Sequence, residues 1–153
     1  MRISIVPTED VRLLTMLDKR IFNADDAFVP EDFSNYACFL VQADGVPVGS
    51  VVLGEHLTVG SGFEEKEPIE LGTLYIVSMG VVPEYQGCGI GNFEEAWEIE
   101  YAREKGFRKV VTNARQGNRR VISLNNKFGF VPTRTIPNYY DDGEDSIVME
   151  LVI

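Results

Sequence analysis

The sequence predicts an α+β or mixed α/β fold, a central sheet flanked by helices, built as one domain over residues 1–153. Two observations predict this class. Two apolar runs meet at Asp44-Gly45, a pair typical of an antiparallel hairpin. Further along, a buried apolar strand is followed by a glycine-rich loop, a helix and another strand. With 153 residues, 44% of them hydrophobic, the chain can bury a core of its own.

The N-terminal segment predicts a strand, a helix and a loop. Ile3 to Val6 is a short strand. Thr8, which precedes two acidic residues, is the expected cap of the helix. Phe22 to Asn35 has no sustained period and predicts a loop with a short helix. The first helix carries its apolar residues on one face: Val11, Leu14, Leu17 and Ile21.

The hairpin and the strand after it form the middle of the expected sheet. Tyr36 to Gln42 and Val46 to Leu53 are the two hairpin strands. A polar, glycine-containing loop around Gly60 to Pro68 follows. Leu71 to Val82 is apolar and β-branched enough for a central, buried strand, which Pro83 ends.

The remaining chain alternates helices and strands. Gly89 and Gly91 open a helix that Gly106 ends, and Lys109 to Thr112 is the next strand. The residues of this helix at helical spacing are Phe93, Ala96, Trp97 and Tyr101. Asn118 is the expected cap of a further helix, which ends at Gly129. The residues of this helix expected to face the core are Val121, Ile122, Leu124 and Phe128. Strands near Phe130 to Thr133 and over Ser146 to Val152 complete the sheet.

The net charge and the cysteine content limit which binding partners and which cellular compartment are expected. A formal net charge of −10 disfavours nucleic acid, which proteins bind through Lys and Arg. No apolar run is long enough to cross a bilayer, and no signal-peptide pattern occurs, so we expect a cytoplasmic protein without membrane contacts. Cys38 and Cys88 have no CxxC spacing and are expected to be reduced. His56 has no partner at metal-ligand spacing, so no metal is expected.

A glycine-rich loop between a buried strand and a helix carries the chemistry. Gly87, Gly89 and Gly91 follow Val82, and such a loop exposes backbone amides at a helix N-terminus, where a pyrophosphate binds. A Walker loop is disfavoured because Asn92 and Phe93 stand where Lys and Ser or Thr are needed. The dinucleotide fingerprint fails as well, which leaves another nucleotide or a turn that only links strand to helix.

The segment Gln86-Gly87-Cys88-Gly89-Ile90-Gly91 resembles the pyrophosphate loop, Q/R-x-x-G-x-G/A, of the GNAT superfamily of N-acetyltransferases. Asn118 and the run Leu124 to Phe130 stand where that family has its N and LY-x-K-x-GF signatures. The stretch Arg134 to Asp145 is similar to the R-x-x-x-NYY-x-DGEDA segment of protein N-terminal acetyltransferases, including the ribosomal-protein alanine type. The resemblance implies a mostly antiparallel sheet with a splayed strand before the loop, and acetyl-coenzyme A as co-substrate.

The resemblance also implies roles for individual residues. Backbone amides of Met79, Gly80 and Val81 would bind the pantetheine arm and the thioester carbonyl. Asn118 would contact the cofactor beside the thiol. The pyrophosphate would be held by Gln86, Gly87, Cys88, Gly89, Ile90, Gly91 and Asn92.

At the two positions where the family has its base and its acid, this sequence departs from the family's pattern. Asn113 and Asn125 stand where relatives place a Glu or His base and a Tyr acid, and asparagine cannot titrate. Tyr75 matches a strand tyrosine that works beside an ordered water in eukaryotic relatives, and is equally well a packed aromatic. Tyr139 and Tyr140 would line a peptide cleft or anchor their loop.

The lack of a base at the family's position affects which kind of amine is expected as the acceptor. At physiological pH roughly a fifth of an α-amine is neutral but only about a thousandth of a lysine amine, so a weak base suits a peptide N-terminus or similar primary amine. Acidic residues at Asp25-Asp26 and Asp141 to Asp145 keep a small cationic amine, such as a polyamine or an antibiotic, open as the acceptor. A degenerate module that binds acyl-coenzyme A without turnover is the other alternative. The exposed edges of such a sheet would allow a homodimer.

Overall fold

A computed structural model describes residues 1–24, 26–55 and 70–153. His56, Asp25 and the predicted loop around Gly60 to Pro68 lie outside the described residues. The chain divides into two compact units, one comprising residues 1–53 and 77–97, the other residues 54–76 and 98–153. Two strands and one helix contain residues of both units. The expectation of one domain over residues 1–153 stays a prediction.

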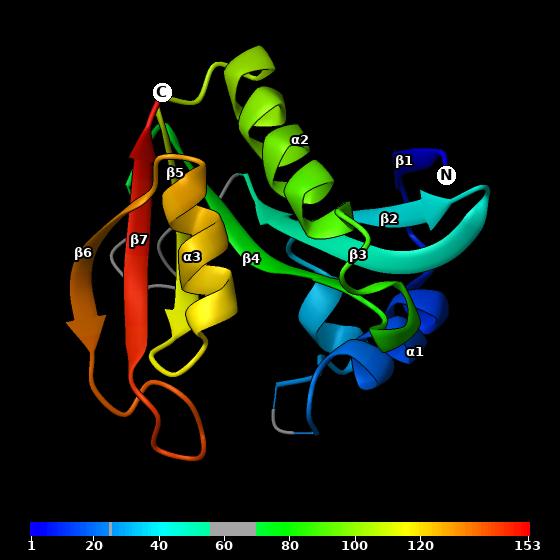
Figure 1. Cartoon of the computed structure of the whole chain (residues 1–153), viewed down its shortest axis with the longest axis horizontal. Helices are drawn as coiled ribbons and strands as arrows, with labels where there is room; N and C mark the ends of the chain where they lie inside the picture. Colours follow the sequence, from blue (N-terminus) through cyan, green and yellow to red (C-terminus); the bar gives the residue numbers. More distant parts are fainter. Residues whose placement is uncertain (25, 56–69) are drawn as a thin grey trace. The chain divides into compact units, whose positions relative to one another are not determined.

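The first unit contains the N-terminal strands and the α1 helix (Figure 1). Its elements are β1 (Ile3–Pro7), α1 (Val11–Ile21), the 3-10 helix η1 (Pro30–Phe33), β2 (Ala37–Ala43) and β3 (Val46–Gly54) up to residue 53. β1 pairs antiparallel with β2, and β2 with β3. Asp44 and Gly45 have φ values of 50° and 81°, the left-handed conformations of a type I′ turn, as the hairpin signal predicts.

β4 (Thr73–Val81) and α2 (Ile90–Glu104) likewise contain residues of both units. Between them stands the 3-10 helix η3 (Pro83–Tyr85). α2 ends two residues before Gly106, whose φ of 82° makes it the predicted C-terminal glycine. The first two residues of the predicted strand, Leu71 and Gly72, precede β4 as a turn, and Val82 lies beyond its end.

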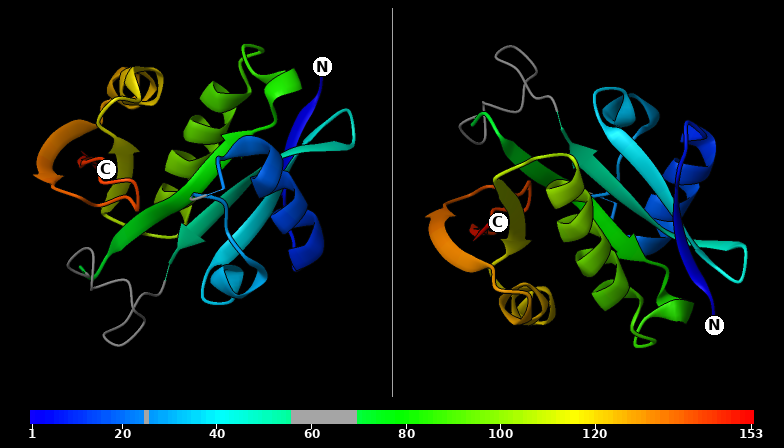
Figure 2. Two further views of the ribbon diagram at one scale, coloured as in Figure 1. Left: turned by 90° about the horizontal axis from the view of Figure 1, so that it is seen from below. Right: turned by 90° about the horizontal axis from the view of Figure 1, so that it is seen from above.

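The second unit contains β5 (Lys109–Arg115), α3 (Arg119–Lys127), β6 (Val131–Ile136) and β7 (Ser146–Val152). β5 and β6 both pair antiparallel with β7, and α3 lies against one face of these strands (Figure 2). β6 carries Pro132 next to a break in register, which an edge strand tolerates because it donates fewer ladder hydrogen bonds. The predicted strand and helix order of this half is confirmed.

Pairing links seven strands in the order β1-β2-β3-β4-β5-β7-β6, and the mixed, mostly antiparallel sheet is confirmed. The parallel exception is β4 with β5. Their register runs only from Thr73, opposite Lys109, to Ile76, opposite Thr112, although both strands continue. The splay of the strand before the loop stays a prediction.

The first helix is capped two residues later than predicted. Asp10, not Thr8, is the N-cap residue, and its Oδ1 accepts a hydrogen bond of 3.1 Å from Leu13 N. The Thr8 hydroxyl instead accepts from Asp10 N at 3.0 Å and so fixes the cap itself. Carboxylates are good caps because they satisfy free amides at a helix start. Leu14 and Leu17 are buried on the predicted face.

Glutamates are buried on α2 together with the apolar Ile90, Ile99 and Ala102, which the apolar pattern did not predict. Phe93 is 41% exposed and Ala96 is exposed, whereas Glu94, Glu95 and Glu98 are fully buried. Within the described part of the chain, neither carboxyl oxygen of Glu94 has a hydrogen-bond partner. Burial raises the pKa of Glu94 well above its ordinary value, with Glu95 adding to the effect, and burial raises the pKa of Glu95 to about 7.

Asp18 is a buried carboxylate that ties the loop after α1 to the helix. It is fully buried, and its Oδ2 accepts a hydrogen bond of 3.1 Å from Phe28 N. Phe28 in turn packs edge-on against the buried Phe33 of η1, with ring centroids 5.3 Å apart. Burial raises the pKa of Asp18 from 3.8 to about 6, although the hydrogen bond from Phe28 N opposes this.

Replacing Asp18 by Asn should remove a pH-dependent loss of stability. Because the folded state holds the Asp18 proton more tightly than the unfolded chain does, the contribution of Asp18 to stability is fully present below pH 3.8 and is lost as pH rises through 6. Between pH 4.5 and pH 7.5 the wild type should lose about 2 kcal/mol of unfolding free energy relative to Asp18→Asn. Urea unfolding of both proteins across that range tests this, and a difference that does not change with pH would contradict it.

Candidate functional site

The loop between β4 and α2 is tied to the end of the strand by a side chain. Gln86 Nε2 donates a hydrogen bond of 3.0 Å to the carbonyl oxygen of Val81, the last residue of β4. The backbone amide of Gln86 donates to Pro83 O at 3.2 Å and closes the η3 turn. Gln86 thus fixes where the loop leaves the strand, and its side-chain amide is already engaged within the protein.

Two glycines of this loop have backbone conformations that other residues rarely adopt. Gly87 has a φ of 79° and Gly89 a φ of 87°. A Cβ added at either position would meet no heavy atom of the described residues within 4 Å, so among these residues open space lies beside both glycines. Cys88 between them is exposed and its thiol is free. The loop therefore presents its backbone rather than bulky side chains.

The start of α2 adds a set of amides that the helix cannot satisfy. The earliest helical hydrogen bond runs from Phe93 N to Gly89 O at 3.2 Å, so the preceding amides of Ile90 and Gly91 have no helical carbonyl to bind. The aligned peptide dipoles place about half a positive charge at this end. Open left-handed glycines followed by a helix N-terminus fit a pyrophosphate. Asn92, in the first turn, is half-buried.

The second half of β4 is packed so closely that there is no room for a side chain at position Gly80. A Cβ at Gly80 would lie 2.5 Å from Ile21 Cγ2 and 3.2 Å from the Phe22 ring. A Cβ at Gly49 of β3 would lie 2.3 Å from the Gly80 carbonyl oxygen. Val82 N, just beyond the strand, donates to Val48 O at 2.8 Å. These contacts fix the backbone of Met79, Gly80 and Val81, where the sequence predicts amide donors for a cofactor.

The two asparagines at the family's acid and base positions make structural hydrogen bonds within the second unit. Asn113 Nδ2 donates to the hydroxyl of the buried Ser146 at 2.8 Å. Asn125 is only 2% exposed, and its Nδ2 lies 3.4 Å from Met149 Sδ. Tyr75 is 4% exposed, and its hydroxyl accepts a hydrogen bond of 3.0 Å from Glu70 N. Asn118 is the N-cap of α3, as predicted, and accepts from Val121 N at 3.2 Å.

The predicted acceptor tyrosines lie together in the segment between β6 and β7. The rings of Tyr139 and Tyr140 meet edge-on with centroids 5.0 Å apart, and the Arg115 guanidinium stacks 4.1 Å from the Tyr140 ring centroid. Sequence reasoning missed Arg115 and its partner Glu144. The signal that was available is a single basic residue at the end of β5 and an acidic run, Asp141 to Asp145, before β7.

Among the residues that the structure describes, no cluster of three His, Cys, Asp or Glu could hold a metal ion. Within the same residues, no helix is long and apolar enough to cross a membrane.

Comparisons with known proteins give a consistent assignment. The model of the Acetyltransferase (GNAT) family matches residues 9–130. A Bacillus subtilis protein provisionally named a [ribosomal protein bS18]-alanine N-acetyltransferase is 33% identical over 79 residues, which cover 51% of this chain and 52% of that protein. A mycothiol acetyltransferase of an Arthrobacter species is 35% identical over 104 residues, 68% of this chain and 30% of that protein. The match thus spans about half the length of the first relative and less of the second.

Solved structures show the same fold. The crystal structure of the ribosomal-protein-S18-alanine N-acetyltransferase from Escherichia coli superposes with a TM-score of 0.81 at 21% identity and covers 99% of this chain and 94% of that chain. At this identity the likeness concerns the fold.

Replacing Gly89 by Ala should weaken coenzyme A binding. A side chain at a φ of 87° is strained, so the loop would have to move the amides that follow. We expect an increase in Kd for coenzyme A of about tenfold or more, the equivalent of about 1.4 kcal/mol. Gly45→Ala is the matched control, since Gly45 lies in the β2–β3 turn with a φ of 81°, and a Cβ added there would likewise meet no heavy atom within 4 Å. Isothermal titration calorimetry measures both, and equal Kd changes in the two variants would contradict the assignment.

Proposed function

Because this chain belongs to the Acetyltransferase (GNAT) family, we propose that it transfers the acetyl group of acetyl-coenzyme A to a primary amine. The observation that carries the proposal is the loop from Gln86 to Gly91, where left-handed glycines and the N-terminus of α2 together suit a pyrophosphate. A turn that only joined strand to helix would not need two such glycines with open space beside them. Acetyl-coenzyme A supplies a thioester that an amine can attack.

The backbone of β4 would stabilise the charge that develops during acyl transfer. An amide of Met79, Gly80 or Val81 would donate to the carbonyl oxygen. A fixed donor of this kind contributes roughly 3 to 4 kcal/mol to transition-state stabilisation. Positioning and this hydrogen bond would therefore account for much of the rate, since the nucleophile is already an amine.

We further propose that the acceptor is the α-amine of a peptide N-terminus. Asn113 and Asn125 cannot take up the proton of an ammonium group, and their amides already bind Ser146 and Met149. An acceptor with a pKa near 8 partly loses its proton without help, which lysine side chains do far less. The Bacillus subtilis relative, provisionally named a [ribosomal protein bS18]-alanine N-acetyltransferase, supports this acceptor class by its name.

A small-molecule amine is the second candidate acceptor, favoured by the likeness to mycothiol acetyltransferases. A module that binds the coenzyme without turnover is the third reading, favoured by the two asparagines. The free thiols of Cys38 and Cys88 are consistent with a reducing compartment, so the proposal includes a cytoplasmic location. A homodimer through the sheet edges stays a proposal.

An acceptor screen tests the function. Purified protein is incubated with acetyl-coenzyme A and, in turn, peptides with a free N-terminus, N-terminally blocked peptides with a lysine, polyamines and aminoglycosides, and thiol release is measured. We expect kcat/KM for the free N-terminus to exceed that for the lysine peptide by about 100-fold, following the difference in neutral amine. Preference for lysine or polyamines would overturn the α-amine assignment. Saturable coenzyme binding with no turnover on any acceptor would overturn the transferase.

A further inference from the structure

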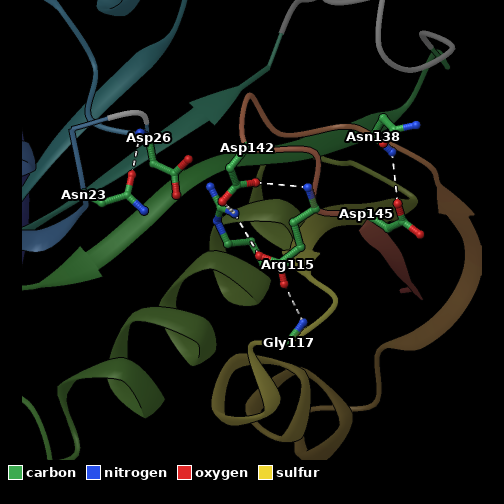
Figure 3. A network of polar contacts seen from close by, with 8 residues as sticks. Asn23, Asp26, Arg115, Gly117, Asn138, Asp142 and Asp145 are labelled. Atoms are coloured by element: carbon green, nitrogen blue, oxygen red, sulfur yellow. Dashed lines mark hydrogen bonds and ion pairs between the residues drawn. The ribbon is translucent and has the colours of Figure 1, made fainter.

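Arg115 at the end of β5 is the centre of a polar cluster within the second unit (Figure 3). Its Nη1 lies 2.8 Å from Asp142 Oδ2 and 2.8 Å from Glu144 Oε1. The Arg115 side chain is only 15% exposed, compared with 47% for Asp142 and 32% for Glu144. A cation that is largely withdrawn from water needs such partners, so these pairs are more than loose surface contacts.

Both acidic partners also hold backbone groups. Glu144 uses its other oxygen, Oε2, to accept a hydrogen bond of 2.8 Å from Gly117 N. Asp142 Oδ1 accepts from Glu144 N at 3.0 Å, a hydrogen bond that holds the pKa of Asp142 below its ordinary value, with Arg115 adding to the effect. The carboxylate of Glu144 therefore bridges the segment before β7 to the segment that follows β5.

The same cluster sets the conformation of the tyrosine loop, residues 137–145 between β6 and β7. Tyr140 N donates to Glu144 O at 3.1 Å, and Gly143 N donates to Tyr140 O at 2.8 Å. The Arg115 guanidinium stacks on the Tyr140 ring, whose edge-on partner is Tyr139. At the base of the loop, the backbone amide of residue 138 donates to Asp145 Oδ1 at 3.0 Å. Arg115 thus contacts the loop through two carboxylates and one aromatic face.

The other end of the cluster adjoins the start of α3. Gly117, which the Glu144 carboxylate holds, directly precedes Asn118, the N-cap of α3 and a predicted contact of the cofactor. Asn118 N donates to Arg115 O at 2.9 Å. One guanidinium and one carboxylate therefore join the segment expected to meet the acceptor to the segment expected to meet the coenzyme.

We propose that Arg115 and Glu144 form a clamp that positions Tyr139 and Tyr140 for the acceptor amine relative to the N-terminus of α3. The inference rests on the proposed transferase function and assigns Arg115 as a positioning residue, acting through the tyrosine loop. Arginine suits this place because its planar guanidinium stacks on an aromatic face while its N–H edge binds carboxylates, and lysine offers no such plane.

Steady-state kinetics of Arg115→Met and Arg115→Lys test the clamp. Misplacement of the loop should lower kcat/KM for the acceptor about 10- to 100-fold in Arg115→Met, mainly through KM, while KM for acetyl-coenzyme A stays within about twofold. Arg115→Lys should recover only part of the loss. The matched control is Arg103→Met in α2, whose side chain is 57% exposed and makes an ion pair of 3.8 Å with Glu100. An unchanged acceptor KM in a folded Arg115→Met protein would overturn the proposal.

A second measurement does not depend on turnover. Hydrogen exchange at the amides of Gly117, Tyr140 and Gly143 should accelerate in Arg115→Met and in Glu144→Gln, but not in Arg103→Met, because those amides are held by the cluster. If Arg115→Met fails to fold, Glu144→Gln carries both tests, since it keeps the side-chain shape. Accelerated exchange in the cluster variants, together with a wild type that shows no turnover, would contradict the proposed function but not the clamp. Unchanged exchange in both cluster variants would sink the clamp.

Discussion

The amides of Ile90 and Gly91 at the start of α2, which no carbonyl of the helix itself can bind, are the constraint on which the proposed cofactor site depends. A helix cannot bind its own first amide groups, so they must face water, a cap or a ligand. Here the loop keeps them open: Gln86 binds the end of β4, and Gly87 and Gly89 take conformations closed to most residues. The glycines at positions 49 and 80 serve the same end, because they let β3, β4 and the end of α1 approach closely enough to fix the strand that leads into the loop.

The sequence was informative where local chemistry decides the structure. The Asp44-Gly45 turn, the glycines of the loop between β4 and α2, Gly106 and the Asn118 cap each have a local reason to be where they are, and the structure places them there. Apolar periodicity was sufficient for α1, whose Leu14 and Leu17 are buried. It was insufficient for α2, where buried Glu94 and Glu95 stand on the core face while Phe93 is largely exposed. A hydropathy pattern does not predict a buried carboxyl group, because burying it costs free energy that other interactions of the fold must offset. The contacts of Arg115 were equally hidden, because its partners lie 27 and 29 residues further along the chain.

Because positions 113 and 125 carry no titrating side chain, neither can supply the general base or acid of acyl transfer. Asn113 and Asn125 are held by Ser146 and Met149, so both belong to the packing of the second unit. A reaction that gains little from general base catalysis must gain from an acceptor that is already neutral and from accurate placement. On this account the amide donors of β4 stabilise the charge that develops during acyl transfer, and the order of the tyrosine loop places the acceptor.

The most direct test of the central claim is a nuclear magnetic resonance titration of isotope-labelled protein with coenzyme A. The account predicts that the amide signals of Gly87, Gly89 and Gly91 shift with a common saturation curve, and that adenosine diphosphate, which shares the pyrophosphate, moves the same signals. Binding that leaves these three amides unchanged while other signals shift would place the coenzyme elsewhere and contradict the account.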